Sequence, residues 1–143
     1  MQQSRRTNKS KLSLNCWSIC ILDKKSDDKK TQILCEVMIG NDGNVIESAY
    51  KINIYIAPFK DYLYVHWASN MNYQYTVMEE DRVKLSAISQ APIYPSEALC
   101  GMRFKIDVPN EKLEEALKEI KIEILLLYPN GEDRKEENLE ALL

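Results

Sequence analysis

The amino-acid sequence predicts a mainly β protein, an antiparallel sandwich or open barrel that carries one late helix. Short segments in which apolar and polar residues alternate fill the first hundred residues, and turn residues separate them at intervals of roughly ten positions. The period changes only after Pro109, where apolar residues recur at helical spacing. The alternative is an α+β domain in which that helix packs across one face of an antiparallel sheet.

Length and charge point to one domain without an electrostatic preference for nucleic acid. The chain has 143 residues, of which 45% are hydrophobic and 29% charged, so it is long enough to bury a core. The net charge of -3 gives no reason to bind nucleic acid or an acidic membrane. No apolar run reaches the roughly 20 residues of a membrane-spanning helix. Residues 1–11 hold four basic residues and no acid, and we expect a disordered tail there.

The predicted strands begin at residue 12. Residues 12–22 form the first strand, and the charged segment 23–30 leads as a solvated loop to the second, over 31–40. The turn "GNDGN" (40–44) favours a hairpin onto residues 45–57, because Asn, Asp and Gly accept positive φ. In that next strand Ile52, Ile54 and Ile56 share one face, which we assign to the core. Further strands are predicted over 62–69, 73–79, 83–89 and 102–109.

The last part of the chain contains the predicted helix and one more strand. "NEKLEEALKEIK" (110–121) has apolar residues at helical spacing, with Asn110 as a candidate N-cap. "IEILLLYPNG" (122–131) returns to a buried strand that a Pro-Asn-Gly turn ends. The expected organisation is therefore a tail over 1–11, a β-sandwich domain over 12–131, and a short helical or frayed tail over 132–143.

Four cysteines, Cys16, Cys20, Cys35 and Cys100, raise the question of a zinc site. Cys16 and Cys20 lie on one predicted strand, where four residues span ~13 Å. That distance is too long for shared zinc ligation or for a disulfide between them. We therefore expect free, mostly buried thiols, no metal and no cofactor. Free thiols are typical of a reducing compartment, which favours a cytoplasmic location.

The segment "DYLYVHWASN" (61–70) crowds aromatic residues and the chain's one histidine together. In a strand, Leu63, Val65 and Trp67 share one face, whereas Tyr62, Tyr64 and His66 share the other. The aliphatic face belongs in the core and takes Trp67 with it. The remaining three side chains are then left on the outside of the sheet.

Other tyrosines could extend this outer surface. Tyr55 points outward from its strand, and it would join Tyr64 and His66 in one aromatic surface if the two strands pair. Tyr73 and Tyr75 follow closely in sequence. Exposed aromatic rings with polar tips stack on sugar rings or anchor protein interfaces. The alternative is that these tyrosines only pair across strands of a half-buried sheet.

Residues 50–138 resemble the starch-binding type of carbohydrate-binding module, which occurs in amylases and glucan, water dikinases. "YVHWAS" matches the "YxHWG"-like strand of that family, and "IEILLLYPNGEDRKEEN" matches its late apolar strand and turn in outline. The resemblance implies an immunoglobulin-like β-sandwich with a glucan site at His66, Trp67 and Tyr75. The chain departs from the family at Ala68, which replaces a glycine. It also lacks the tryptophans expected near Tyr75 and in the C-terminal loop, so the glucan site would be altered or lost.

No catalytic pattern accompanies these residues. His66 has no second histidine, and no recognised motif places a nucleophile or carboxylate beside it. We therefore expect a non-catalytic binding module rather than an enzyme, with a polysaccharide of the α-glucan type as its ligand. The second hypothesis is an adaptor or inhibitor domain that binds a protein through the same face or an edge strand, with a homodimer as one outcome. The expected binding residues are Tyr55, Tyr64, His66, Trp67 and Tyr75.

Overall fold

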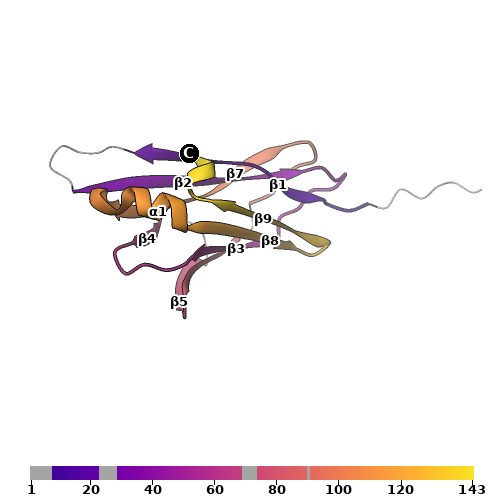
Figure 1. Cartoon of the computed structure of the whole chain (residues 1–143). Coiled ribbons are helices and arrows are strands. Elements are labelled where there is room, and N and C mark those ends of the chain that lie inside the picture. The colour runs from indigo at the N-terminus through magenta and orange to yellow at the C-terminus, as the bar shows by residue number, and fades with distance from the viewer. Residues whose placement is uncertain (1–7, 23–28, 69–73, 90) are drawn as a thin grey trace, which may run out of the picture.

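The protein is a sandwich of two antiparallel sheets, seen from the side in Figure 1. The structure, a computed structural model, describes residues 8–22, 29–68, 74–89 and 91–143, without the side chains of 15–22, 89 and 99–101. One sheet has the order β1 (Leu12–Leu22), β2 (Lys30–Asn41), β7 (Ala98–Pro109), β4 (Tyr64–Trp67). The other has the order β5 (Gln74–Glu79), β6 (Arg82–Ser89), β3 (Tyr50–Ala57), β8 (Lys121–Tyr128), β9 (Gly131–Asn138). The prediction of a mainly β antiparallel sandwich is confirmed.

The strand order is that of an immunoglobulin-like sandwich with an added hairpin. Constant-type immunoglobulin domains place strands A, B, E and D in one sheet and C, F and G in the other. Naming β1, β2, β3, β4, β7, β8 and β9 as A to G reproduces both orders. The β5–β6 hairpin then extends the second sheet beside strand C. Unlike the extra strands of variable-type domains, it follows strand D in the chain.

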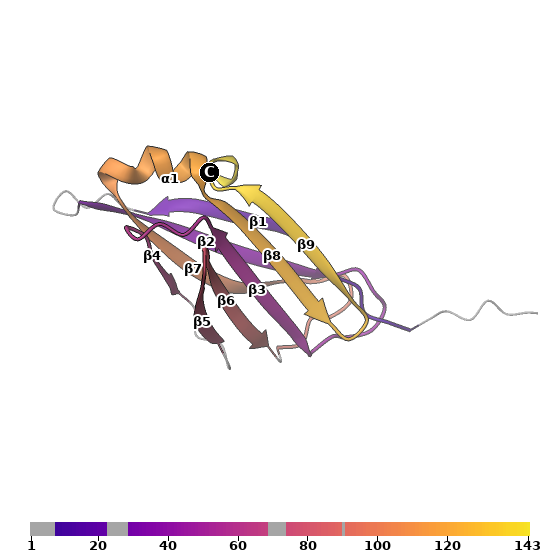
Figure 2. The same cartoon turned by 60° about the horizontal axis from the view of Figure 1, so that its bottom comes forward.

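One short helix accompanies the sheets, and it lies in the connection from β7 to β8. The 3-10 turn η1 (Asn110–Lys112) precedes α1 (Leu113–Glu119), which buries Ala116 and carries the chain to the other sheet (Figure 2). Asn110 is not the N-cap that the sequence predicts, because it is the first residue of η1 and the N-cap of α1 is Lys112. Its Oδ1 accepts a hydrogen bond from Thr31 Oγ1 at 2.5 Å instead. No helix in the described ranges has the length or apolar character needed to cross a membrane.

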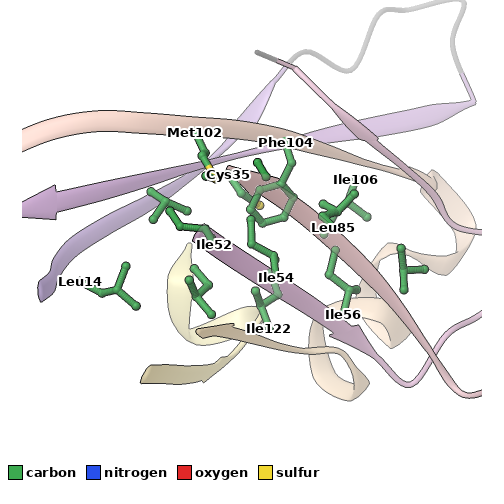
Figure 3. Packing of buried hydrophobic residues seen from close by; sticks show 14 of the residues in the cluster. Leu14, Cys35, Ile52, Ile54, Ile56, Leu85, Met102, Phe104, Ile106 and Ile122 are labelled. Carbon is green, nitrogen blue, oxygen red and sulfur yellow. The ribbon is translucent and has the colours of Figure 1, made fainter. Parts of the chain in front are cut away.

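The core fills the space between the sheets with alternating side chains from both. Ile52, Ile54 and Ile56 of β3 are fully buried, as their alternation predicts. They face Phe104 and Ile106 of β7, both also fully buried (Figure 3). At about 25 cal/mol per Å² of apolar surface, such burial is the main stabilising contribution to the sandwich.

Cys35 lies within this core, and burial raises the pKa of its thiol far above the ordinary value. The thiolate is the species that reacts with alkylating reagents, so we expect Cys35 to resist iodoacetamide in the native protein. Peptide mapping by mass spectrometry would give little modification of Cys35 in buffer and full modification in denaturant. Rapid alkylation of Cys35 in buffer would contradict the burial.

The turn at residues 40–44 does not close a hairpin. β2 pairs with β1 and β7, whereas β3 belongs to the other sheet, so the chain crosses between sheets here. Asn41, only 1% exposed, holds this crossing, because its Nδ2 donates to the carbonyls of Val45 at 2.8 Å and Ile93 at 2.9 Å. The chain bends at residues 43–45, but no residue of 40–44 has the positive φ that the sequence predicts, and β2 continues to Asn41. Turn chemistry also does not reveal which sheet the next strand joins.

Both ends of the domain differ from the sequence prediction. The predicted basic tail lies partly outside the described residues, but Lys9 is placed, since its N–H donates to Asn44 Oδ1 and its carbonyl accepts from Asn44 N–H. Residues 131–138 form strand β9 rather than a helix or frayed tail, and only Glu140–Leu142 is a helical turn. β9 pairs with β8 through the main chain at the sheet edge, so it needs no apolar alternation and its charged sequence gave no strand pattern.

Candidate functional site

The predicted aromatic residues are divided between the two outer faces of the sandwich. β3 pairs with β6 and β8, whereas β4 pairs with β7 in the other sheet. Tyr55 and Tyr64 therefore belong to different sheets, and the predicted continuous surface of Tyr55, Tyr64 and His66 is wrong. The segment between β3 and β4 crosses from one sheet to the other, which the local sequence does not indicate.

Tyr64 and His66 share the outer face of the four-stranded sheet, as alternation predicts. Their ring centroids lie 4.8 Å apart, and Tyr64 is 60% exposed. His66 Nε2 lies 3.4 Å from Asp107 Oδ2, close enough for an ion pair when the imidazole is protonated. Tyr62, expected beside them, instead precedes β4 and packs half-buried against the core, because the alternation does not extend into the turn before the strand.

Trp67 points inward and packs half-buried against the core at the margin of its sheet. Its indole N–H donates to the carbonyl oxygen of Tyr75 on β5 at 3.4 Å, a long hydrogen bond. β4 and β5 are edge strands of the two sheets, so Trp67 closes the sandwich along this side. A direct sugar contact by the indole face, which the resemblance implies, is at odds with this position.

The structure brings Tyr55 and Tyr75 together on the outer face of the five-stranded sheet. Tyr55 pairs in register with Lys84 and Asn53 with Ser86 on β6. Tyr75 pairs with Ser86 from the other side, so Tyr75, Ser86 and Asn53 form one row across three strands. We call this surface the tyrosine face and define it by its members from β3, β5 and β6: Lys51, Asn53, Tyr55, Tyr75, Val77, Arg82, Lys84, Ser86 and Ile88.

Cations surround the Tyr55 ring. The Arg82 guanidinium carbon lies 4.1 Å from the ring centroid, a cation–π distance, and Lys84 Nζ lies at 5.9 Å. Arg82 Nε also donates to Glu79 Oε1 at 2.9 Å, which fixes the guanidinium above the ring. The contact leaves Tyr55 half-buried and offers a planar aromatic–guanidinium pair to a ligand.

Tyr75 is 43% exposed and sits over a buried polar pair. Ser86 Oγ donates to Asn53 Oδ1 at 2.6 Å, and both residues are buried although they lie on the outer side of the sheet. A hydrogen bond with Ser86, followed by the charges of Lys51 and Lys84, holds the pKa of the Tyr75 phenol below its ordinary value. Lys51 and Lys84 therefore both lie near the Tyr75 phenol.

Two hollows border the tyrosine face. A largely apolar hollow of about 330 Å³ lies at one end of β3, against Lys51, Ile88 and Leu127. A more polar hollow of about 290 Å³ lies at the other end, against Tyr55, Arg82 and Glu119. Exposed apolar residues therefore continue from Val77 and Ile88, each 40% exposed, toward β8.

The sequence could have indicated part of this face. In "RVKLSAIS", Arg82, Lys84 and Ser86 alternate with buried Val83, Leu85 and Ala87, so their outward direction follows from periodicity. Periodicity does not show that β6 lies between β5 and β3, so the contact of Arg82 with the Tyr55 ring cannot be predicted from the sequence.

Within the described part of the chain, no group of three or more His, Cys, Asp or Glu side chains is placed to hold a metal ion. Comparison with protein-family models, curated proteins and solved structures finds no match to this chain. The strand order and the face geometry describe an immunoglobulin-like β-sandwich that carries tyrosines among charged residues on one outer sheet face.

Proposed function

We propose that this chain is a non-catalytic binding module that recognises a protein partner through the tyrosine face. The observation that carries the proposal is the joining of Tyr55, Arg82 and Tyr75 on one face of adjacent strands. Tyrosine and arginine are enriched at protein interfaces, and they supply most of the large losses in alanine scanning. Most other outer-face positions of a sandwich carry small polar or charged groups that contribute little to binding.

The neighbours of these residues favour the same proposal. Val77 and Ile88 expose apolar surface beside Tyr75, and Lys51 and Lys84 add positive charge around it. A central apolar and aromatic patch with charges around it is the usual anatomy of a transient protein interface. The positive charges favour a partner whose contacting segment is acidic.

A polysaccharide of the α-glucan type is the second candidate ligand. The observation in its favour is the exposed Tyr75 ring beside the polar groups of Ser86 and Asn53, which suits a sugar ring stacked on an aromatic and hydrogen-bonded at its edge. The separation of Tyr64 and His66 onto the opposite sheet counts against a broad stacking platform. Protein recognition is therefore the first candidate.

Tyr75→Ala is expected to weaken partner binding strongly, whereas Tyr64→Ala leaves it unchanged. Tyr64 is the matched control, since it is an exposed strand tyrosine on the opposite sheet. Loss of a central aromatic contact typically costs about 2 kcal/mol or more, a fall in affinity of roughly 30-fold. The measurement is affinity capture from cell extract with quantitative mass spectrometry, followed by titration of the captured protein.

Two results would contradict this assignment. Equal capture by wild type and Tyr75→Ala would exclude the tyrosine face, provided that both proteins unfold at the same temperature. The second result is that the wild-type chain binds insoluble starch, Tyr75→Ala does not, and no protein is captured. The ligand of the tyrosine face would then be a glucan rather than a protein.

A further inference from the structure

The edge of the five-stranded sheet at β5 has the properties of a pairing surface. β5 pairs with β6 on one side, and no strand in the described ranges pairs with its other side. Residues 74–78 contain no charged residue and no proline. The opposite edge strand, β9, has six charged residues among its eight. Edge strands of monomeric proteins are usually protected by charges, proline or a covering segment, so β5 departs from the usual pattern.

Apolar side chains project from both sides of this edge. Tyr75 and Val77 lie on the outer face, and Met78, which is 57% exposed, lies on the other face. The Trp67 indole reaches the carbonyl of Tyr75 at 3.4 Å. A carbonyl oxygen has two lone pairs, so this one can also accept a main-chain hydrogen bond. In Figure 1, β5 lies at the lower margin of the molecule.

We propose that β5 pairs antiparallel with β5 of a second copy of this chain, about a two-fold axis at Thr76. The two five-stranded sheets would join into one continuous sheet, and each copy would present the same strand to the other. Such an isologous contact closes on itself and gives a dimer rather than a fibre.

The register follows from the side chains. Directly opposed residues of an antiparallel pair point to the same face, so a continuous outer face requires the two-fold axis to pass through a residue rather than between two residues. A centre at Tyr75 would pair only Gln74 to Thr76 within β5, because the strand begins at Gln74. A centre at Val77 would set Glu79 opposite Tyr75 of the second copy. A centre at Thr76 sets Tyr75 opposite Val77 and Thr76 opposite Thr76. Aromatic–β-branched and Thr–Thr pairs are both favourable across strands.

The charges of the surrounding residues are compatible with this register. Glu79 is already paired with Arg82 at 2.9 Å and lies beyond the uncharged segment. No formal charge is therefore buried between the copies. A pairing of about five residues covers less than the roughly 1,000 Å² of a stable interface, so the dimer should be weak and concentration-dependent.

A charge exchange at Thr76 tests this proposal. Thr76 is exposed, so Thr76→Lys and Thr76→Glu should both fold, and each would set two like charges opposite each other at the two-fold axis. Light scattering across a concentration series should show wild type approaching twice 16.6 kDa and each variant remaining at 16.6 kDa. An equimolar mixture of the two variants should regain the dimer. Ile88→Lys, with the same 40% exposure as Val77 but one strand from the edge, should dimerise as wild type does.

Wild type that stays at 16.6 kDa at every concentration would overturn the proposal. So would single variants that dimerise as wild type does, because the contact would then lie elsewhere. A mixture that remains monomeric would overturn the two-fold register at Thr76. Thr76 lies on the opposite side of β5 from Tyr75, so the variants keep the tyrosine face, and partner capture tests that function separately.

Discussion

Replacing Trp67 by alanine is expected to lower the free energy of unfolding by about 3 kcal/mol, the lower end for a large aromatic because the ring is only half-buried. The change removes apolar contacts with the core and the hydrogen bond to the Tyr75 carbonyl, which joins the margins of the two sheets. Trp67→Phe should recover most of the lost free energy of unfolding, because a phenyl ring restores the apolar contacts and only the N–H donor is missing. Urea unfolding monitored by circular dichroism measures both.

His66→Ala is the matched control for this prediction. His66 is the preceding residue on β4, with its side chain 30% exposed on the outer face, and we expect a change of less than about 1 kcal/mol. A stable Trp67→Ala protein together with an unstable His66→Ala protein would mean that β4 is displaced by one residue. Such a slip exchanges the two faces of a strand. It would also restore Trp67 as a ligand contact, as the family resemblance implies.

Side-chain alternation predicted the faces of individual strands well, because burial on one side selects residues with a period of two. The inward isoleucines of β3 and the outward Tyr64 and His66 of β4 are examples. Alternation does not say which strands are neighbours. The pairing of β3 with β6 and β8 depends on contacts between segments far apart in the chain, so the predicted joining of Tyr55 and Tyr64 failed.

The candidate site could be predicted only in part for the same reason. The outward direction of Tyr55 follows from alternation, but the Arg82 contact with Tyr55 requires β6 between β5 and β3. The family resemblance named His66, Trp67 and Tyr75 together. In the structure these residues lie on two sheets, and the Trp67–Tyr75 contact is a hydrogen bond from side chain to backbone. Residues that are close in sequence lie on different sheets when the chain crosses between the sheets. Whether such a motif forms one surface therefore cannot be predicted until the crossing is known.

The second large effect is expected at the crossing between β2 and β3, where Asn41→Ala should cost about 3 kcal/mol. The Asn41 amide makes four hydrogen bonds: its Nδ2 donates to two carbonyls, and its Oδ1 accepts from the N–H groups of Gly43 at 2.9 Å and Lys11 at 3.3 Å. Alanine would remove this partner from the N–H groups of Gly43 and Lys11 and from the Val45 carbonyl, at a site where Asn41 is 1% exposed, whereas the Ile93 carbonyl still accepts from Glu47 N–H at 3.1 Å. The surrounding backbone has little room to move into the space that the amide leaves. It is already tightly packed, because a Cβ added at Gly43 would lie within 3.0 Å of backbone atoms of Lys9 and Lys11.

Asn44→Ala provides the comparison, because Asn44 lies in the same turn but is exposed, and its Oδ1 accepts from Lys9 N–H at 3.0 Å. Loss of an exposed hydrogen bond should cost less than about 1 kcal/mol, since water replaces the partner. Asn41→Asp separates hydrogen bonding from side-chain volume. The carboxylate has nearly the same shape, but it sets an oxygen against the carbonyls of Val45 and Ile93 that Nδ2 now contacts. It should therefore destabilise at least as much as alanine in thermal or urea unfolding at neutral pH. An Asn41→Asp protein as stable as wild type would mean that the amide does not hold the crossing, and that the turn residues direct the chain from one sheet to the other by their backbone preferences alone.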